Sequence, residues 1–185
     1  MPRLRIENFK CYRKEELLFG DLTVLVGTNG AGKSSVIQSL LLLHEAVNSP
    51  KERHRLPLND FRSQNLGSAS DIVFNNDTSL DIKLSWLVDK PLKSCRVTLR
   101  RPDGDSMFNI DKVKCFKGEN ELTKAEFHFI SADRIGSSIA QSMHSSENLN
   151  VGDKGEYCAQ LLADTYSHKV NSSRLHGNNT SPFIL

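Results

Sequence analysis

No stretch of this sequence is apolar enough to suggest a membrane span. Hydrophobic residues make up 38% of the 185 positions, and the longest uninterrupted aliphatic run covers only residues 40–43. A helix needs about 20 mostly apolar residues to cross a bilayer. The chain starts Met-Pro-Arg-Leu-Arg and lacks the apolar core of a signal peptide there. We therefore expect a cytoplasmic protein without a membrane partner.

Cysteine is scarce and scattered. Cys11, Cys95, Cys115 and Cys158 stand far apart and form no C-x-x-C pair. This spacing predicts neither a disulfide framework nor a zinc site, and it fits a reducing cytoplasm. The six histidines are scattered as well, and we interpret each as a surface residue rather than a metal ligand.

A strong excess of charge of either sign is also missing. Lys and Arg number 24 and Asp and Glu number 22, for a formal net charge of +2. Affinity for nucleic acid therefore cannot be inferred from net charge. One basic cluster, at residues 51–55, lies in a polar stretch from 48 to about 70. It is either a solvated surface or a nucleic-acid contact.

The most informative feature is a phosphate-binding loop at residues 27–34. These residues read Gly-Thr-Asn-Gly-Ala-Gly-Lys-Ser, a complete G-x-x-x-x-G-K-[ST] motif. The β-branched run at 23–26 precedes it and predicts a buried strand, and the apolar periodicity of 34–47 predicts a helix. Strand, glycine loop and helix form the context that the motif requires. The alternative is a glycine turn that only caps a helix.

The residue types suit a nucleoside triphosphate. Glycines let consecutive backbone N–H groups point at the phosphates, and the following helix adds the positive end of its dipole. Lys33 can reach the β- and γ-phosphates, and the Ser34 hydroxyl can ligate Mg²⁺. We therefore expect ATP and Mg²⁺ as ligands, Lys33 as a catalytic residue and Ser34 as a metal ligand. The candidate nucleotide-binding residues of the loop are Gly27, Asn29, Gly30, Ala31, Gly32, Lys33, Ser34 and Ser35.

The rest of the chain reads mainly as strands. Near-alternating apolar residues predict strands at 4–9 and 17–19, and strict alternation predicts one at 80–88. Further alternating segments and turn signals extend to residue 130 and predict an antiparallel meander of about four or five strands over 79–130. Small nucleotide kinases and GTPases alternate strand and helix instead.

The C-terminal third predicts less regular structure. Residues 136–150 are rich in Ser, Asn and Gly and predict a mobile loop. Helical spacing of apolar residues over 155–169 predicts a second helix. We expect one domain over 1–170, followed by a disordered tail at 171–185.

Two segments carry a family resemblance. Residues 4–10 read Leu-Arg-Ile-Glu-Asn-Phe-Lys, and residues 22–35 contain the phosphate loop roughly twenty residues further on. This pair resembles the N-terminal lobe of ABC-type ATPases of the SMC, RecF and OLD group. Residues 129–136 and 151–157 are similar to a bacterial "AAA family ATPase" subgroup that often sits in phage-defence loci. The Asn29-Gly30 pair is more typical of this group than of GTPases.

The resemblance implies a fold and a mechanism. The fold would be an α/β P-loop NTPase of the ABC-type head class, in which this chain forms the N-terminal lobe with an antiparallel β-meander. Two such heads would sandwich ATP, and a Walker B Asp-Glu pair would hold Mg²⁺ and orient water. A second head or C-terminal lobe is thus an implied partner. A nuclease or other effector, and nucleic acid, are possible further partners.

The sequence departs from the family in lacking two elements. No four-residue apolar run ends in Asp-Glu, and no L-S-G-G-like signature is present. In the family both lie beyond the region that this chain covers. We therefore expect the C-terminal lobe to be missing, either by truncation or because another polypeptide supplies it.

The segment at 133–136, Asp-Arg-Ile-Gly, has several interpretations. It matches the D-x-x-G of GTPases, but the guanine-reading N-K-x-D is absent downstream. In the ABC-type interpretation it follows a strand where a γ-phosphate sensor would stand, and Asp133, Arg134 or Gln141 could serve. Asp133 is then a second candidate catalytic residue and Arg134 a second candidate nucleotide contact. The alternative is a surface ion pair.

The role of Lys10 and Arg13 and the function of the whole chain each have alternative interpretations. Lys10 and Arg13 follow the first strand, where family members contact adenine or ribose, although a solvated basic turn is equally compatible. At the level of function, the rivals to an ATPase lobe are a self-contained P-loop kinase and a non-hydrolysing interaction module. The meander and the lack of an arginine-rich lid disfavour the kinase.

Overall fold

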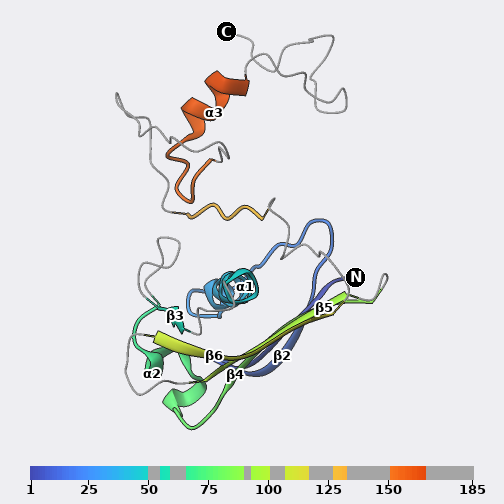
Figure 1. Ribbon diagram of the computed structural model, residues 1–185, viewed down its shortest axis with the longest axis vertical. Helices are drawn as coiled ribbons and strands as arrows, with labels where there is room; N and C mark the ends of the chain where they lie inside the picture. The colour runs from blue at the N-terminus through green and yellow to red at the C-terminus, as the bar shows by residue number, and fades with distance from the viewer. Residues whose placement is uncertain are drawn as a thin grey trace. The chain divides into compact units, whose positions relative to one another are not determined.

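The computed structural model describes residues 1–49, 55–58, 66–89, 93–100, 107–116, 127–132 and 151–165. The chain divides into two compact units, Met1–Phe127 and His128–Leu185, which we describe separately. The first unit holds a β-sheet with a long helix, α1 (Lys33–Asn48), along one face (Figure 1). Helix α3 (Cys158–Thr165) belongs to the second unit.

The sheet of the first unit is antiparallel throughout, with strand order β2-β1-β4-β5-β6-β3. Its strands, in chain order, are β1 (Arg3–Phe9), β2 (Tyr12–Leu18), β3 (Arg55–Pro57), β4 (Ile82–Val88), β5 (Lys93–Arg100) and β6 (Met107–Phe116). Because β1 pairs with both β2 and β4, the N-terminal hairpin and the later meander form one continuous sheet.

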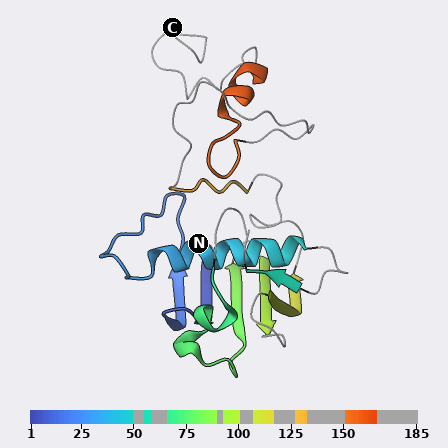
Figure 2. The ribbon, with the colours of Figure 1, turned by 90° about the vertical axis from the view of Figure 1, so that its left-hand side faces the viewer.

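The hydrophobic core lies between this sheet and α1. Residues that pair across neighbouring strands point to the same face of a sheet. Ile6 pairs with Leu84, and Leu84 pairs with Val97, so these three side chains form one row that points inward. All three are fully buried, as are Leu42 and Leu43 of α1. Figure 2 shows α1 crossing the strands on this face. Helix α1 begins at Lys33, inside the phosphate loop, so its burial against the sheet holds the end of this loop in place.

The predicted meander is confirmed in its central part. Ile82, Leu84, Trp86 and Val88 alternate inward on β4 and are buried, as the strict apolar alternation predicts. Strands β4, β5 and β6 follow as antiparallel neighbours. The last expected strand is wrong, because residues 127–130 adopt no strand. Phe127 instead stacks on His44 of α1, with ring centroids 4.1 Å apart.

The expected strand at residues 23–26 is wrong. These residues adopt no regular structure, and the side chains of Leu22, Val24 and Val26 are 84%, 70% and 88% exposed. A strand needs a neighbour to accept its backbone hydrogen bonds, and within the described residues no strand pairs with this segment. The local preference of these residues for a strand is therefore not realised in this part of the fold.

Other boundaries shift where pairing overrides local composition. The second strand starts at Tyr12 rather than near Leu17, because the charged residues 13–16 pair with β1. Within the polar stretch from 48 to about 70, β3 pairs with β6 and α2 (Ala69–Ile72) begins. The short helix η1 (Phe74–Asn76) follows α2.

Helix α3 begins at Cys158, within the span predicted from 155 onward. The expected mobile loop at 136–150 and disordered tail at 171–185 lie outside the described residues. Among the helices that the structure describes, none is long and apolar enough to cross a membrane.

The expectation that the cysteines stay unpaired is wrong for two of them. Cys95 and Cys115 form a disulfide between β5 and β6, where they face each other in register with Cα atoms 4.1 Å apart. The 20 residues between them conceal this proximity in the sequence. Cys11 and Cys158 are free thiols.

Candidate nucleotide-binding site

The phosphate loop runs from residue 27 into the first turn of α1. Gly30 and Gly32 have φ values of 82° and 88°, in the left-handed region that favours glycine. Gly32 is the N-cap of α1, and the N–H group of Val36 donates to its carbonyl over 3.1 Å. The N–H groups of the first helical turn after Gly32 therefore point toward the loop. This is the arrangement in which a helix start binds an anion.

Gly32 is also fixed by close packing against the turn between β1 and β2. A Cβ atom at position 32 would lie 2.7 Å from the Cys11 Sγ atom and 2.7 Å from the Tyr12 hydroxyl oxygen. The Tyr12 hydroxyl donates to the Gly32 carbonyl over 3.3 Å. A side chain at position 32 would displace the Cys11 and Tyr12 side chains and would also stand at a positive φ, so glycine is strongly favoured here. The N-terminal hairpin thereby forms a side wall of the phosphate loop.

Lys33 closes the loop on itself. Its ammonium group donates to the carbonyl oxygens of Gly27, at 2.8 Å, and Thr28, at 2.6 Å. These contacts hold the cation beside the backbone that would surround the phosphates. The site is thus preorganised, with a positive charge already placed beside the loop.

A cavity of about 290 Å³ opens between this loop and the β1–β2 turn. Most of the predicted loop residues line it together. Gly27 and Ala31 belong to the loop but do not line the cavity. Cys11 lines it without having been predicted, because only the close approach of the hairpin to Gly32 reveals its position. The lining residues are Lys10, Cys11, Asn29, Gly30, Gly32, Lys33, Ser34 and Ser35.

Lys10 brings a second cation to the cavity. Its ammonium donates to the Gln38 Oε1 atom of α1 over 2.7 Å. Burial lowers the pKa of Lys10, although the nearby Cys11 and Asp71 act in the opposite direction. A half-buried ammonium that is short of negative charge is suited to an anionic ligand. The predicted role of Lys10 near the nucleotide is therefore compatible with its place in the structure.

The position of Lys10 depends on α2. The Lys10 N–H group donates to the carbonyl of Ile72, the last residue of α2, over 2.8 Å. At the start of α2, the Asp71 carboxylate accepts hydrogen bonds from the Ser68 hydroxyl (2.7 Å) and the Ser68 N–H (2.8 Å). These two bonds, followed by the charge of Lys10, lower the pKa of Asp71. Helix α2 thus supports the turn that presents Lys10.

The donor set fits Mg²⁺ together with a phosphate ligand. The exposed Ser34 hydroxyl lines the cavity and offers a hard oxygen ligand. No carboxylate is among the described residues that line the cavity. Elsewhere in the described residues, no group of three or more His, Cys, Asp or Glu side chains is placed to hold a metal ion. From the described residues, Mg²⁺ here would therefore draw on Ser34, together with phosphate oxygens.

The remaining predicted residues do not join this cavity in the part of the chain that the structure describes. Arg13 is exposed on β2 and does not line the cavity. Asp133, Arg134 and Gln141 lie outside the described residues.

Comparison with known proteins supports the family resemblance inferred from the sequence. A family model described as "AAA ATPase domain" matches residues 1–175. The OLD nuclease of Thermus scotoductus is 28% identical over 127 residues, which cover 65% of this chain and 21% of that protein. The chain therefore spans about a fifth of the length of this relative. The resemblance inferred from residues 4–10 and 22–35 is confirmed: the chain belongs to the AAA ATPase domain family.

Proposed function

We propose that this chain is the ATP-binding lobe of an ABC-type ATPase head and that it holds Mg-ATP on the loop at residues 27–34. The observation that carries this proposal is the placement of two lysines, Lys33 and Lys10, around one cavity at the start of α1. The loop and the helix start supply backbone N–H groups to the phosphates. The family match supports ATP as the nucleotide.

The two lysines, Ser34 and the glycines of the cavity have distinct parts in this proposal. Lys33 neutralises charge on the β- and γ-phosphates, and Ser34 holds Mg²⁺, which offsets further phosphate charge when bound. Lys10 reaches the nucleotide from the opposite wall. The glycines keep the backbone close enough for its N–H groups to donate to phosphate oxygens.

Among the residues that the structure describes, no carboxylate lines the cavity to orient the attacking water. We therefore propose that hydrolysis requires a second head or a C-terminal lobe that carries the Walker B and signature elements. We propose a role in a DNA-related or phage-defence system, which the resemblance of residues 129–136 and 151–157 implies, and the likeness to an OLD nuclease supports a nuclease as the effector.

Binding and turnover can be separated on the 185-residue chain. We expect it to bind Mg-ATP and to release phosphate hardly faster than buffer, because no carboxylate among the described lining residues is placed to orient water. Equilibrium titration with a labelled ATP analogue and a malachite-green phosphate assay measure the two. Robust turnover that Lys33→Ala abolishes would contradict the proposal and make Asp133 the first residue to test.

The same lack of a carboxylate favours one second candidate, a module that binds ATP without hydrolysing it. Adding a polypeptide with Walker B and signature elements discriminates between the two functions. Turnover in the mixture supports the ATPase lobe, and binding without turnover supports the module. The self-contained kinase is disfavoured by the antiparallel order β2-β1-β4-β5-β6-β3.

A further inference from the structure

The face of the sheet opposite α1 is rich in cations. Along β4, β5 and β6 the side chains that alternate away from the core include Lys83, Arg96 and Lys114, all of them exposed. Within the first unit, no described helix covers this outer face, since α1 packs on the other one (Figure 2). This outer face is distinct from the nucleotide cavity, which lies beside the start of α1.

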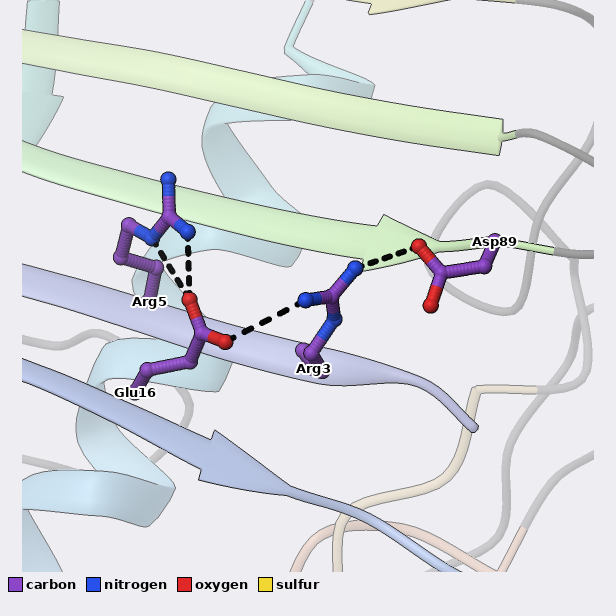
Figure 3. Close-up of polar contacts among 4 residues, drawn as sticks. All are labelled: Arg3, Arg5, Glu16 and Asp89. Carbon is purple, nitrogen blue, oxygen red and sulfur yellow. Dashed lines mark hydrogen bonds and ion pairs between the residues drawn. The ribbon is translucent and has the colours of Figure 1, made fainter.

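Beside β1, the acidic side chains Glu16 and Asp89 are already paired with arginines. Figure 3 shows Arg3 between Glu16 and Asp89, with Arg5 on the other side of Glu16. The Arg5 Nε atom donates to Glu16 over 2.9 Å. The strongest effect that lowers the pKa of Glu16 is its hydrogen bond from Arg5. Two arginines therefore share one glutamate, so Glu16 offers little negative charge to other cations.

Near the start of β4 and the end of β5, two aspartates, Asp81 and Asp111, likewise form ion pairs. Arg100 lies 3.3 Å from Asp81 and 3.6 Å from Asp111, and Lys112 lies 3.9 Å from Asp111. One further acidic side chain, Glu7, lies opposite Lys83 in the register of the sheet without an ion pair to it. Glu7 is thus the one described acidic side chain of this face that stands opposite a central cation, and one carboxylate against Lys83, Arg96 and Lys114 leaves the cluster net positive.

The central three cations have no ion pair or hydrogen bond among the described residues. Arg96 and Lys114 are directly opposite each other on β5 and β6, and like charges in that relationship destabilise a sheet. Lys83 and Arg96 line a hollow of about 270 Å³ together with Arg5, Glu7 and Ser85. Such a cluster is suited to an anion that bridges several strands.

We propose that the central cations of this outer face, Lys83, Arg96 and Lys114, bind the phosphodiester backbone of a nucleic acid. Neighbouring strands lie about 4.8 Å apart, and side chains two residues apart on one strand are separated by about 6.8 Å. The cations therefore form a two-dimensional array that can meet several phosphates at once. The Thr98 hydroxyl, opposite Lys83, adds a donor of the kind that commonly contacts phosphate.

A nucleic acid fits this face better than a membrane surface does. Peripheral membrane binding usually combines cations with apolar side chains that enter the lipid. Among the described residues of β4, β5 and β6, Val113 is the large apolar residue with an exposed side chain. It lies between Lys112 and Lys114 on β6, so its side chain points to the opposite face of the sheet from theirs. The contact should therefore be electrostatic, independent of sequence and sensitive to salt.

The test is fluorescence anisotropy with a labelled DNA duplex of about 25 base pairs over a series of salt concentrations. The triple variant Lys83→Ala/Arg96→Ala/Lys114→Ala should bind at least tenfold more weakly at low salt. The slope of log affinity against log salt should become shallower by roughly 2 to 3, because each lost phosphate contact removes about 0.9.

A second triple variant, Lys51→Ala/Arg53→Ala/Arg55→Ala, removes the same charge from the basic cluster at 51–55. It should lose less than about threefold and keep the slope. An equal loss in both variants, or a loss confined to the second, would overturn the proposal. So would a wild-type chain that does not bind the duplex at low salt.

Two further arms keep the test specific. Vesicles that contain anionic lipid, and polyglutamate, should bind more weakly than the duplex and respond less to the outer-face triple variant; an equal response would overturn the proposal in favour of a general anion surface. ATP titration of that variant should match wild type, which shows that it is folded. Lys33→Ala should retain duplex binding, so failure of ATP binding is distinguishable from failure of this inference.

Discussion

The ammonium group of Lys33 lies 2.6 Å from the carbonyl oxygen of Thr28, within the loop that precedes it. The lysine at the start of α1 and the backbone of the loop therefore hold each other in place. A phosphate that enters the cavity meets a cation that is already oriented, and little further ordering of this side chain is required. This relationship makes the loop geometry, as well as the charge, part of the site.

The packing of Gly32 predicts different effects for two alanine substitutions. Gly30→Ala and Gly32→Ala both place a side chain at a positive φ, which costs roughly 1 kcal/mol. Only the Cβ at position 32 would also meet Cys11 and Tyr12, whereas nothing lies within 4 Å of one at position 30. Gly32→Ala should therefore lower the free energy of unfolding further, measured by urea denaturation. Equal losses would contradict the packing between the hairpin and the loop.

Lys10→Met tests the second cation. The variant removes a half-buried charge, so its ATP affinity should fall about three- to tenfold, or roughly 0.7–1.4 kcal/mol. Its stability without nucleotide should be unchanged or slightly higher. Lys14→Met, on the exposed part of β2, is the matched control. A Lys10→Met variant with wild-type affinity would remove Lys10 from the nucleotide site.

The sign of the pH effect follows from the lowered pKa of Lys10. Below its folded-state pKa both states carry the proton, and the cost of burying the charge is fully present. As pH rises from that value toward the ordinary value of 10.5, the unfolded state binds more protons, so stability relative to Lys10→Met should rise. Urea denaturation of both variants across this range measures the difference, and parallel profiles would contradict the burial of the ammonium.

Asp71 predicts an acid-sensitive contribution to stability. Because its folded-state pKa lies below the ordinary value of 3.8, its contribution is fully present above 3.8 and is lost as pH falls through the folded-state pKa. Asp71→Asn keeps an oxygen acceptor but does not titrate, so its stability should fall less steeply under acid. Unfolding curves at a series of pH values compare it with wild type and with Asp21→Asn on an exposed segment. Identical steepness in wild type and Asp71→Asn would refute this role.

The exposed apolar segment predicts self-association. Leu22, Val24 and Val26 present aliphatic surface that is not covered in the described residues, and such surface commonly drives association. Val24→Lys/Val26→Lys should shift the chain toward monomer in sedimentation velocity. Glu15→Lys makes the same change in net charge at an exposed position of β2 and should not. A wild-type chain that is monomeric at every concentration and in mixtures with a head lobe would contradict the expectation.

Sequence patterns predicted those structural elements whose formation depends on residues close together in the sequence. The loop at 27–34 and helix α1 follow from a motif and a helical period, and β4 follows from strict alternation. The strand β3 could not be predicted, since its existence depends on pairing with β6, about fifty residues away. For the same reason the sequence did not reveal the disulfide between Cys95 and Cys115.

The site shows the same division between local and distant information. Lys33 and Ser34 could be predicted as candidate site residues because their positions are set within a single motif. Cys11 and the support of Lys10 by α2 depend on segments that meet only in the folded chain. The expected strand at 23–26 failed for the opposite reason, since strong local propensity had no pairing partner among the described residues.

Isothermal titration of Mg-ATP into the wild-type chain and Lys33→Ala tests the central claim most directly. Lys33 supplies the cation nearest the loop backbone, so its removal should weaken ATP binding at least tenfold, about 1.4 kcal/mol or more. Lys14→Ala, which removes an exposed lysine of β2, should bind as wild type does. A folded Lys33→Ala variant with unchanged affinity would contradict the assignment of residues 27–34 as the nucleotide site.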